Sequence, residues 1–156
     1  MLLHGRHSTT YDPVTGAATG EWPPAGGRLL IPSYRGYDYL GDVLASQGYV
    51  VVSVSADGIN ARDSNADGGA LARAQLMQRT FGILQDLNQD GVIRTRPADA
   101  IHPGTDLFTG TSSPFGTRFV GHLNLQDIGI MGHSRGGEGV VRSFILNQSL
   151  GSPYGI

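Results

Sequence analysis

The sequence predicts an α/β fold in which a parallel β-sheet is flanked by helices, and three features of the chain indicate it. A β-branched run at residues 49–54 directly follows a segment of helical periodicity that ends at Gly48. A second apolar run, at residues 128–131, leads into another helical segment through Gly132-His133-Ser134-Arg135-Gly136. A third apolar run opens the chain at residues 1–3. Strands that alternate with helices in this way form parallel sheets.

The helical segments are predicted from apolar residues that recur every three or four positions. They lie at residues 39–44, where Asp38 is a candidate N-cap, at residues 71–87 and at residues 140–145. Residues 8–27 and 56–69 are rich in Gly, Pro, Asp and Asn, so we expect polar loops there. Residues 95–121 are expected to be irregular for the same reason.

The composition excludes several classes of function. A chain of 156 residues with 39% hydrophobic and 15% charged residues is expected to fold as one globular domain. Its net charge of −2 provides no basic surface for nucleic acid. No apolar run reaches the length of a transmembrane helix. The chain has no cysteine, so its redox compartment cannot be inferred.

Two loop features suggest binding, and each has a simpler interpretation. Trp22 could form one wall of a substrate site or only pin its loop to the body of the protein. The run Asp86-x-Asn88-x-Asp90-Gly91 resembles the opening half of a calcium loop, but Pro97 stands where the closing carboxylate should be. We therefore expect an Asx-rich turn and no metal, with calcium at Asp86, Asn88 and Asp90 as the alternative.

The motif Gly132-x-Ser134-x-Gly136 predicts a sharp turn from a strand into a helix. A Cβ at either glycine would collide with the neighbouring strand or helix. The turn lifts Ser134 out of the fold and places its Oγ near the N-terminal N–H groups of the following helix. In this feature the chain resembles the α/β-hydrolase family. The form Gly-His-Ser-x-Gly-Gly is common in its esterases and lipases, including cutinase-like polyester hydrolases.

The resemblance covers residues 4–150, but its specific motifs are only His4-Gly5 and the Ser134 turn. It implies a partial α/β-hydrolase fold, with the strand at residues 1–3 between those at 49–54 and 128–131. Ser134 would be the nucleophile, and the backbone N–H groups of Arg6 and Arg135 would form the oxyanion hole. The loop that begins at His4-Gly5 and carries Arg6 is called the oxyanion loop below. The residues expected to support this loop and the turn are His4, Gly5, Gly132, His133 and Gly136.

The acid and the histidine that this family places after the nucleophile are absent from the chain. Glu138 is the only acidic residue after Ser134, and it does not match the family's acid position. We therefore expect the N-terminal to middle part of a longer hydrolase, inactive alone because loss of the base lowers turnover by about 10⁶-fold. A substitute base from His4 or His7 is the alternative. Asp57 is expected to cap a loop or to face the substrate.

The function implied by the resemblance is a serine carboxylic-ester hydrolase that acts on a small-molecule or polymeric ester through an acyl-enzyme. The resemblance alone would suggest secretion. The competing hypothesis is a non-catalytic member or fragment that binds an acyl ligand or a partner chain through the same cleft. In a third hypothesis, two copies of the chain pair and complete each other's active site. The edges of a short parallel sheet would be exposed, which predicts self-association.

Overall fold

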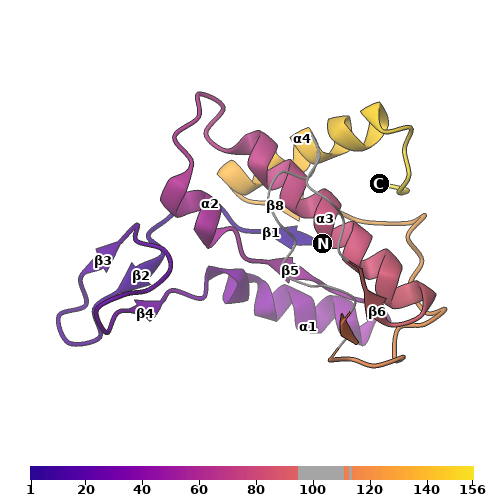
Figure 1. Ribbon diagram of the computed structural model, residues 1–156, viewed down its shortest axis with the longest axis horizontal. Coiled ribbons are helices and arrows are strands. Elements are labelled where there is room, and N and C mark those ends of the chain that lie inside the picture. Colours follow the sequence, from indigo (N-terminus) through magenta and orange to yellow (C-terminus); the bar gives the residue numbers. More distant parts are fainter. Residues whose placement is uncertain (95–110, 113) are drawn as a thin grey trace.

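The computed structural model describes residues 1–94, 111–112 and 114–156, and its centre is a parallel sheet. The strands are β5 (Ser53–Val54), β1 (Leu2–Leu3) and β8 (Met131–Gly132), in that spatial order (Figure 1). Leu2 pairs with Ser53 on one side and with Met131 on the other. The expected order of the strands is therefore confirmed, although the paired part of each strand is only two residues long.

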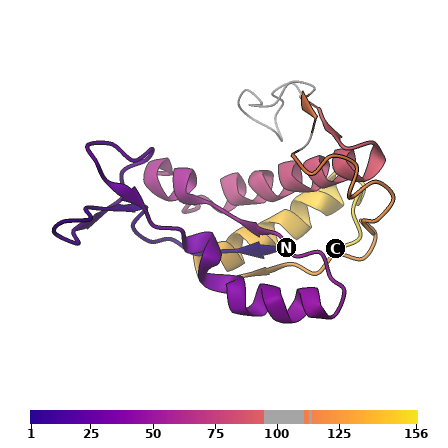
Figure 2. The ribbon, with the colours of Figure 1, turned by 90° about the horizontal axis from the view of Figure 1, so that it is seen from below.

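Helices cover both faces of this sheet. Helix α1 lies on one face, and α3 and α4 lie side by side on the other (Figures 1 and 2). Their bounds are Asp38–Ser46 for α1, Ala70–Gln89 for α3 and Arg135–Ser149 for α4, as the periodicity predicts. Asp38 is not the N-cap, because Tyr37 holds that position after a 3-10 helix, η1 (Ser33–Tyr37). The Asp38 carboxylate instead accepts a hydrogen bond from Arg35 Nε at 2.9 Å.

The hydrophobic core lies between the sheet and α3. Leu3 of β1, Ala56 after β5, and Met77 and Phe81 of α3 are all at most 1% exposed and form one cluster. Full burial of each of the three larger side chains, Leu3, Met77 and Phe81, contributes about 1.5–3 kcal/mol. Ile128 and Ile130, on the segment that leads into β8, pack against the same cluster. The core therefore fixes the carboxyl end of β1 and the segment that leads into β8 relative to α3.

The expectation of a plain loop at residues 8–27 is wrong. Thr10 and Thr19 face each other across an antiparallel pair, and a third strand joins the other side. The turn between the first two strands is held by Asp12, whose Oδ1 accepts N–H groups from Val14 and Thr15 at 2.8 and 3.0 Å. This small sheet projects beside the main body (Figure 1). Its strands are β2 (Thr10–Tyr11), β3 (Ala18–Thr19) and β4 (Leu29–Leu30), in the order β3-β2-β4.

Two other expected loops also contain regular structure. The polar segment at residues 56–69 opens with α2 (Asp57–Arg62), in which Asp57 and Asn60 are buried. In the expected irregular region, β7 (Thr111–Ser112) pairs with β6 (Val92–Ile93), and residues 114–121 form turns. Residues 95–110 and 113 lie outside the described part of the chain, so the expectation for them is not addressed.

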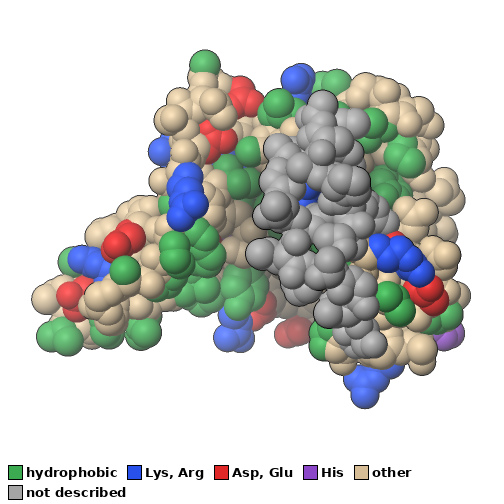
Figure 3. All heavy atoms as spheres, viewed as in Figure 1, with side chains coloured by type: hydrophobic (Ala, Val, Ile, Leu, Met, Phe, Trp, Pro, Cys, Tyr) green, Lys and Arg blue, Asp and Glu red, His purple; other side chains and the backbone are tan. Residues whose placement is uncertain are grey.

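Apolar side chains remain exposed along one side of α4. Val141 is 61% exposed and Ile145 is 48% exposed, and Met131 of β8 is 39% exposed. Self-association was expected through the exposed edges of the sheet, and it stays a prediction. On the described part of the face in Figure 3, arginine and acidic side chains are interspersed. No helix in the described ranges is long and apolar enough to cross a bilayer.

Candidate functional site

Ser134 lies at the apex of the turn between β8 and α4. Its backbone has φ 53° and ψ −126°, a conformation that costs a residue with a side chain on the order of 1–3 kcal/mol. The turn is closed by Gly136 N–H, which donates to His133 O at 2.8 Å. Ser134 is exposed. The serine therefore stands clear of the fold at the carboxyl edge of the sheet, beside the N-terminus of α4 (Arg135–Ser149).

The two glycines of the turn are required by close approach of the backbone, as the motif predicts. A Cβ on Gly132 would meet the carbonyl of Gly136, and would lie 2.7 Å from the nitrogen of Gly137. A Cβ on Gly136 would meet Leu3 O and would lie 2.6 Å from His4 O. Gly136 thus allows the start of α4 to pack directly on the end of β1. Neither glycine needs a positive φ, so space alone decides.

Two backbone N–H groups are available near Ser134. A Cβ on Gly5 would lie 3.0 Å from the Ser134 Cβ, so the peptide that follows Gly5 runs beside the serine. Within the described residues, neither Arg6 N–H nor Arg135 N–H donates to any protein acceptor. An oxyanion that forms on a substrate at Ser134 needs donors of this kind. The structure places both expected donors next to the turn and leaves them unpaired.

The side chains of His133, Arg135 and Glu138, next to the turn, form no hydrogen bond to Ser134. Arg135 Nη1 donates to Glu138 Oε2 at 2.8 Å, so Glu138 is paired with the side chain that follows the serine. His133 was expected to support the turn, and its side chain is exposed. Its Nδ1 would lie 3.2 Å from a Cβ on Gly5. His133 therefore flanks the oxyanion loop from the solvent side.

His4 is 5% exposed and holds the oxyanion loop against the start of α2. Its Nδ1 lies 2.9 Å from Gly5 O, and its Nε2 accepts Ala56 N–H at 2.8 Å. Because a carbonyl only accepts and a backbone N–H only donates, the ring is neutral and carries its proton on Nδ1. Burial lowers the pKa of His4, which favours the same neutral form. The predicted role of His4 in supporting the loop agrees with these contacts.

The neutral His4 ring predicts that stability depends on pH. In the unfolded chain His4 has its ordinary pKa of about 6.5, and in the folded chain its pKa is lower. As the pH falls below about 6.5, the unfolded chain binds a proton that the folded chain does not, so the free energy of unfolding decreases until the folded pKa is reached. Above about pH 6.5 this contribution is fully present.

Urea unfolding of the protein and of His4→Gln between about pH 5 and about pH 8 measures this effect. We expect the variant to lose less stability on acidification than the parent protein does. His122→Gln is the matched control, because His122 is exposed and should leave the profile unchanged. Parallel pH profiles for the parent and the His4 variant would contradict the assignment of a neutral, buried ring.

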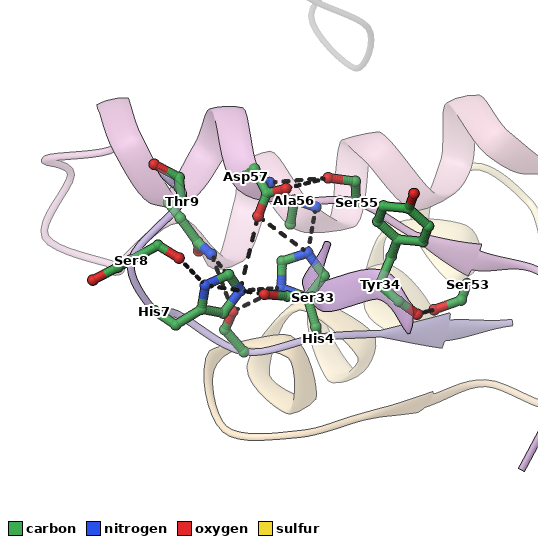
Figure 4. Close-up of polar contacts among 12 residues, drawn as sticks. His4, His7, Ser8, Thr9, Ser33, Tyr34, Ser53, Ser55, Ala56 and Asp57 are labelled. Carbon is green, nitrogen blue, oxygen red and sulfur yellow. Dashed lines mark hydrogen bonds and ion pairs between the residues drawn. The ribbon is translucent and has the colours of Figure 1, made fainter. Parts of the chain in front are cut away.

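His7 and Asp57 complete a compact group with His4 (Figure 4). His4 Nδ1 lies 2.9 Å from His7 Nε2, and His7 Nδ1 bonds to Ser8 O. Asp57 Oδ1 lies 3.7 Å from His4 Nε2 and 3.8 Å from His7 Nε2, without a hydrogen bond of its own. Its other oxygen accepts from Ser55 Oγ at 2.9 Å. Neither histidine is hydrogen-bonded to Ser134, so a substitute base from His4 or His7 gains no support from this arrangement.

Among the described residues, these three side chains are the one group of three or more His, Cys, Asp or Glu residues whose ligand atoms could meet at a metal ion. Their nitrogens are already engaged, because His4 Nε2 accepts Ala56 N–H, and His7 Nε2 lies 2.9 Å from the same His4 Nδ1–H that faces Gly5 O. Asn60 Nδ2 also lies 3.4 Å from His7 Nε2. A metal would have to replace these bonds, since each ring nitrogen has a single lone pair. The group therefore fits a hydrogen-bonded support for the loop better than a metal site.

The candidate calcium side chains are engaged within the protein. Asp86 Oδ2 accepts Arg94 N–H at 2.9 Å, and Asp90 Oδ1 accepts from Arg94 Nη1 at 3.1 Å. Asn88 Oδ1 accepts Leu123 N–H at 2.8 Å. The guanidinium of Arg94 thus provides the positive charge between the two carboxylates. The arrangement favours the Asx-rich turn, and calcium binding stays an untested alternative.

Trp22 packs on the first turn of α2. A Cβ on Gly58 would lie 3.2 Å from its Nε1, and Arg62 Nη2 donates to its carbonyl oxygen at 3.1 Å. These contacts favour the interpretation that Trp22 pins its loop to the body of the protein. That Trp22 forms one wall of a substrate site stays a prediction.

A cavity of about 650 Å³ lies at the opposite end of the sheet from Ser134. Its lining includes Met1, Val50 and Ile128, which lie at or before the amino ends of the three strands. Cavity size alone would favour this end as the binding site. We give more weight to the Ser134 edge, because ligands of open α/β sheets bind at the carboxyl ends of the strands and the unpaired N–H groups lie there.

Comparisons with known proteins were made by family model, by sequence and by structure. No family model, curated protein or solved structure matches the chain. The geometry at Ser134 is therefore the main indication of function.

Asn60 and Arg73 belong to the site but were not expected from the sequence. Asn60 Nδ2 donates to Gly5 O at 3.1 Å, and Arg73 Nη2 donates to Asn60 Oδ1. Both side chains are buried, at 6% and 1% exposure. Asn60 falls in a segment with the composition of a loop, and Arg73 falls among apolar helical positions. A buried arginine needs a polar partner. The arginine among apolar helical positions was therefore the one signal in the sequence that could have pointed to this pair.

Proposed function

We propose that the chain carries the nucleophile and the oxyanion hole of a serine carboxylic-ester hydrolase, in which Ser134 forms an acyl-enzyme. The observation that carries the proposal is the exposed serine at φ 53° beside the unpaired N–H groups of Arg6 and Arg135. A strained turn that presents a serine in this way is typical of the α/β-hydrolase family. The parallel sheet flanked by helices is compatible with part of that fold.

In the proposed reaction, Ser134 Oγ attacks the carbonyl carbon of an ester. The new C–O bond forms while the carbonyl oxygen takes the electron pair and becomes an oxyanion. Arg6 N–H and Arg135 N–H donate to this oxyanion, and loss of one such donor typically lowers turnover by about 10²–10³-fold. The tetrahedral adduct then collapses: the carbonyl re-forms, the bond to the alcohol oxygen breaks, and that oxygen takes up the proton that the base removed from Ser134. A base that accepts the hydroxyl proton of Ser134 is needed, and no histidine in the described residues is bonded to it.

The missing base also supports an alternative function. Without proton transfer, the same turn and N–H groups would bind an acyl carboxylate or carbonyl without turning it over. A partner chain could also use the cleft. This alternative predicts binding without a covalent product at Ser134.

A fluorophosphonate probe distinguishes the two functions by intact mass. We expect stoichiometric labelling of the protein, either directly or after imidazole is added as an external base, and no labelling of Ser134→Ala. Ser152→Ala is the matched control, because Ser152 is also exposed and also has a positive φ, of 56°. It should label like the parent protein.

Each outcome has a defined meaning. Labelling without imidazole would mean that a base lies within the chain or in a second copy. Labelling that requires imidazole would mean that the nucleophile and the oxyanion hole are formed but the base is supplied from outside the chain. A folded protein that stays unlabelled in both conditions would overturn the proposed nucleophile and leave the binding function.

A further inference from the structure

The peptide between Gly5 and Arg6 is held at one end by two buried donors. Its carbonyl oxygen, Gly5 O, lies 2.9 Å from His4 Nδ1, which carries the ring proton, and 3.1 Å from Asn60 Nδ2. The Asn60 bond joins this loop to α2, whereas the His4 contact lies within the loop. The other end of the same peptide is the N–H of Arg6, which donates to no acceptor in the described residues. In the Gly5–Arg6 peptide, the carbonyl oxygen is therefore hydrogen-bonded within the protein, and the N–H is free to donate.

The geometry of a trans peptide links the two ends. Trp22-Pro23 is the one cis bond among the described residues, so the Gly5–Arg6 peptide is trans. In a planar trans peptide the N–H points away from the C=O. Fixing Gly5 O toward Asn60 therefore fixes the direction of Arg6 N–H on the opposite side. Hydrogen bonds to the carbonyl also polarise the peptide and strengthen its N–H as a donor, by about 10–30% per bond.

Asn60 is itself oriented by Arg73. The guanidinium donates from Nη2 to Asn60 Oδ1 and from Nη1 to Gly68 O at 3.0 Å. Because the Asn60 oxygen is held by a cation, the amide cannot turn its oxygen toward Gly5 O, where two acceptors would meet. The NH₂ group is thus directed at Gly5 O. Arg73 is 1% exposed, so this bond is shielded from water.

Arg73 also contacts the helix that carries the second donor. A Cβ on Gly139 of α4 would lie 2.6 Å from Arg73 Cβ, so the two helices touch at this point. Arg135 N–H is at the start of the same helix. Arg73 therefore contacts α4, which carries Arg135. It is also connected, through Asn60, to the peptide that carries Arg6 N–H.

We propose that Asn60, oriented by Arg73, is a positioning residue that aims the Arg6 N–H at the oxyanion formed on Ser134. The inference rests on the proposed function, and it adds a residue of α2 that touches no substrate. His4, the residue before Gly5 in the same loop, contacts the same carbonyl, so loss of Asn60 removes the bond that holds this peptide to α2. A donor displaced by about 1 Å can lower a rate by about 100-fold.

The test compares Asn60→Leu with the parent protein in fluorophosphonate labelling, under the condition in which the parent labels. We expect the maximal rate of covalent labelling to fall by roughly 10- to 100-fold. The probe concentration that gives half of that rate should change little, because Asn60 does not contact the probe. Asn147→Leu is the matched control. Asn147 is also buried, at 2%, but it bonds to Tyr154 and lies away from Gly5.

A spectroscopic measurement separates positioning from general damage. In NMR spectra of the folded variant, the Gly5 carbonyl carbon and the Arg6 amide should shift, while the Arg135 amide should remain near its parent position. Asn60→Asp should not restore the rate, since a carboxylate cannot donate to Gly5 O.

The outcomes are distinct from those of the proposed function. If the parent protein does not label in any condition, the nucleophile itself fails. If the parent labels and Asn60→Leu labels at the same maximal rate, or if Asn147→Leu slows equally, the positioning role of Asn60 is overturned while Ser134 stands.

Discussion

Replacement of Gly136 by alanine is expected to lower the free energy of unfolding by about 3 kcal/mol or more. The added Cβ would meet Leu3 O and would lie 2.6 Å from His4 O. Both are backbone atoms of β1 and its extension, which cannot move aside as a flexible side chain can. The start of α4 must then withdraw from the sheet. Urea unfolding followed by the fluorescence of Trp22, the single tryptophan of the chain, measures the loss.

Gly129→Ala is the matched control for this substitution. Gly129 lies just before β8, the strand that leads to the Ser134 turn. It has no positive φ, and a Cβ there would meet nothing within 4 Å. It should be neutral or should stabilise the protein by about 0.4–1 kcal/mol. If Gly136→Ala were as stable as Gly129→Ala, the close contact between α4 and the end of β1 would be wrong.

Phe81→Ala should lower the free energy of unfolding by about 3–5 kcal/mol. Phe81 is fully buried in the cluster with Leu3, Ala56 and Met77, and its ring centroid lies 5.0 Å from that of Tyr154. Truncation leaves a void between α3 and the sheet, in addition to the lost burial. The same urea measurement applies, and the slope of the transition shows whether the variant still unfolds in one step.

Phe144→Ala provides the comparison. Phe144 is the same residue type on α4, but it is 40% exposed. Its truncation should have a much smaller effect than that of Phe81. Equal losses from the two truncations would mean that the outer side of α4 is covered in solution, as self-association would do.

The parallel sheet and its three main helices were predictable because their patterns are local. Helix α3 (Ala70–Gln89) shows the apolar rhythm of residues 71–87, and the Ser134 motif specifies both a strand end and a helix start. Gly132 and Gly136 were predictable from the same motif. The constraint on Gly132 comes from the helix that follows it in the sequence, whereas the constraint on Gly136 comes from the end of β1.

The elements that were missed have no such pattern. Strands β2 and β3 are two residues long and are paired through backbone bonds, with Asp12 forming the turn. Helix α2 has six residues, and its buried side chains are Asp57 and Asn60. A short helix that buries polar groups has no apolar stripe to detect. Its register is set by tertiary contacts.

The support of the oxyanion loop was missed for a related reason. Asn60 contacts Gly5 across 55 positions of sequence, and Arg73 contacts Asn60 across 13. A single sequence contains no signal for a contact between two polar residues that lie far apart along the chain. The burial of both side chains becomes visible only when α3 and α2 are placed beside the end of β1.

At position 134, the residue that would best stabilise the fold is not the residue that the proposed chemistry needs. Glycine would adopt φ 53° without the strain that a side chain incurs. A selection for thermostability alone would therefore favour glycine at residue 134 and would remove the hydroxyl group. Variants stabilised by design or by screening should be required to keep this serine, because at this site the more stable residue is the one without the proposed nucleophile.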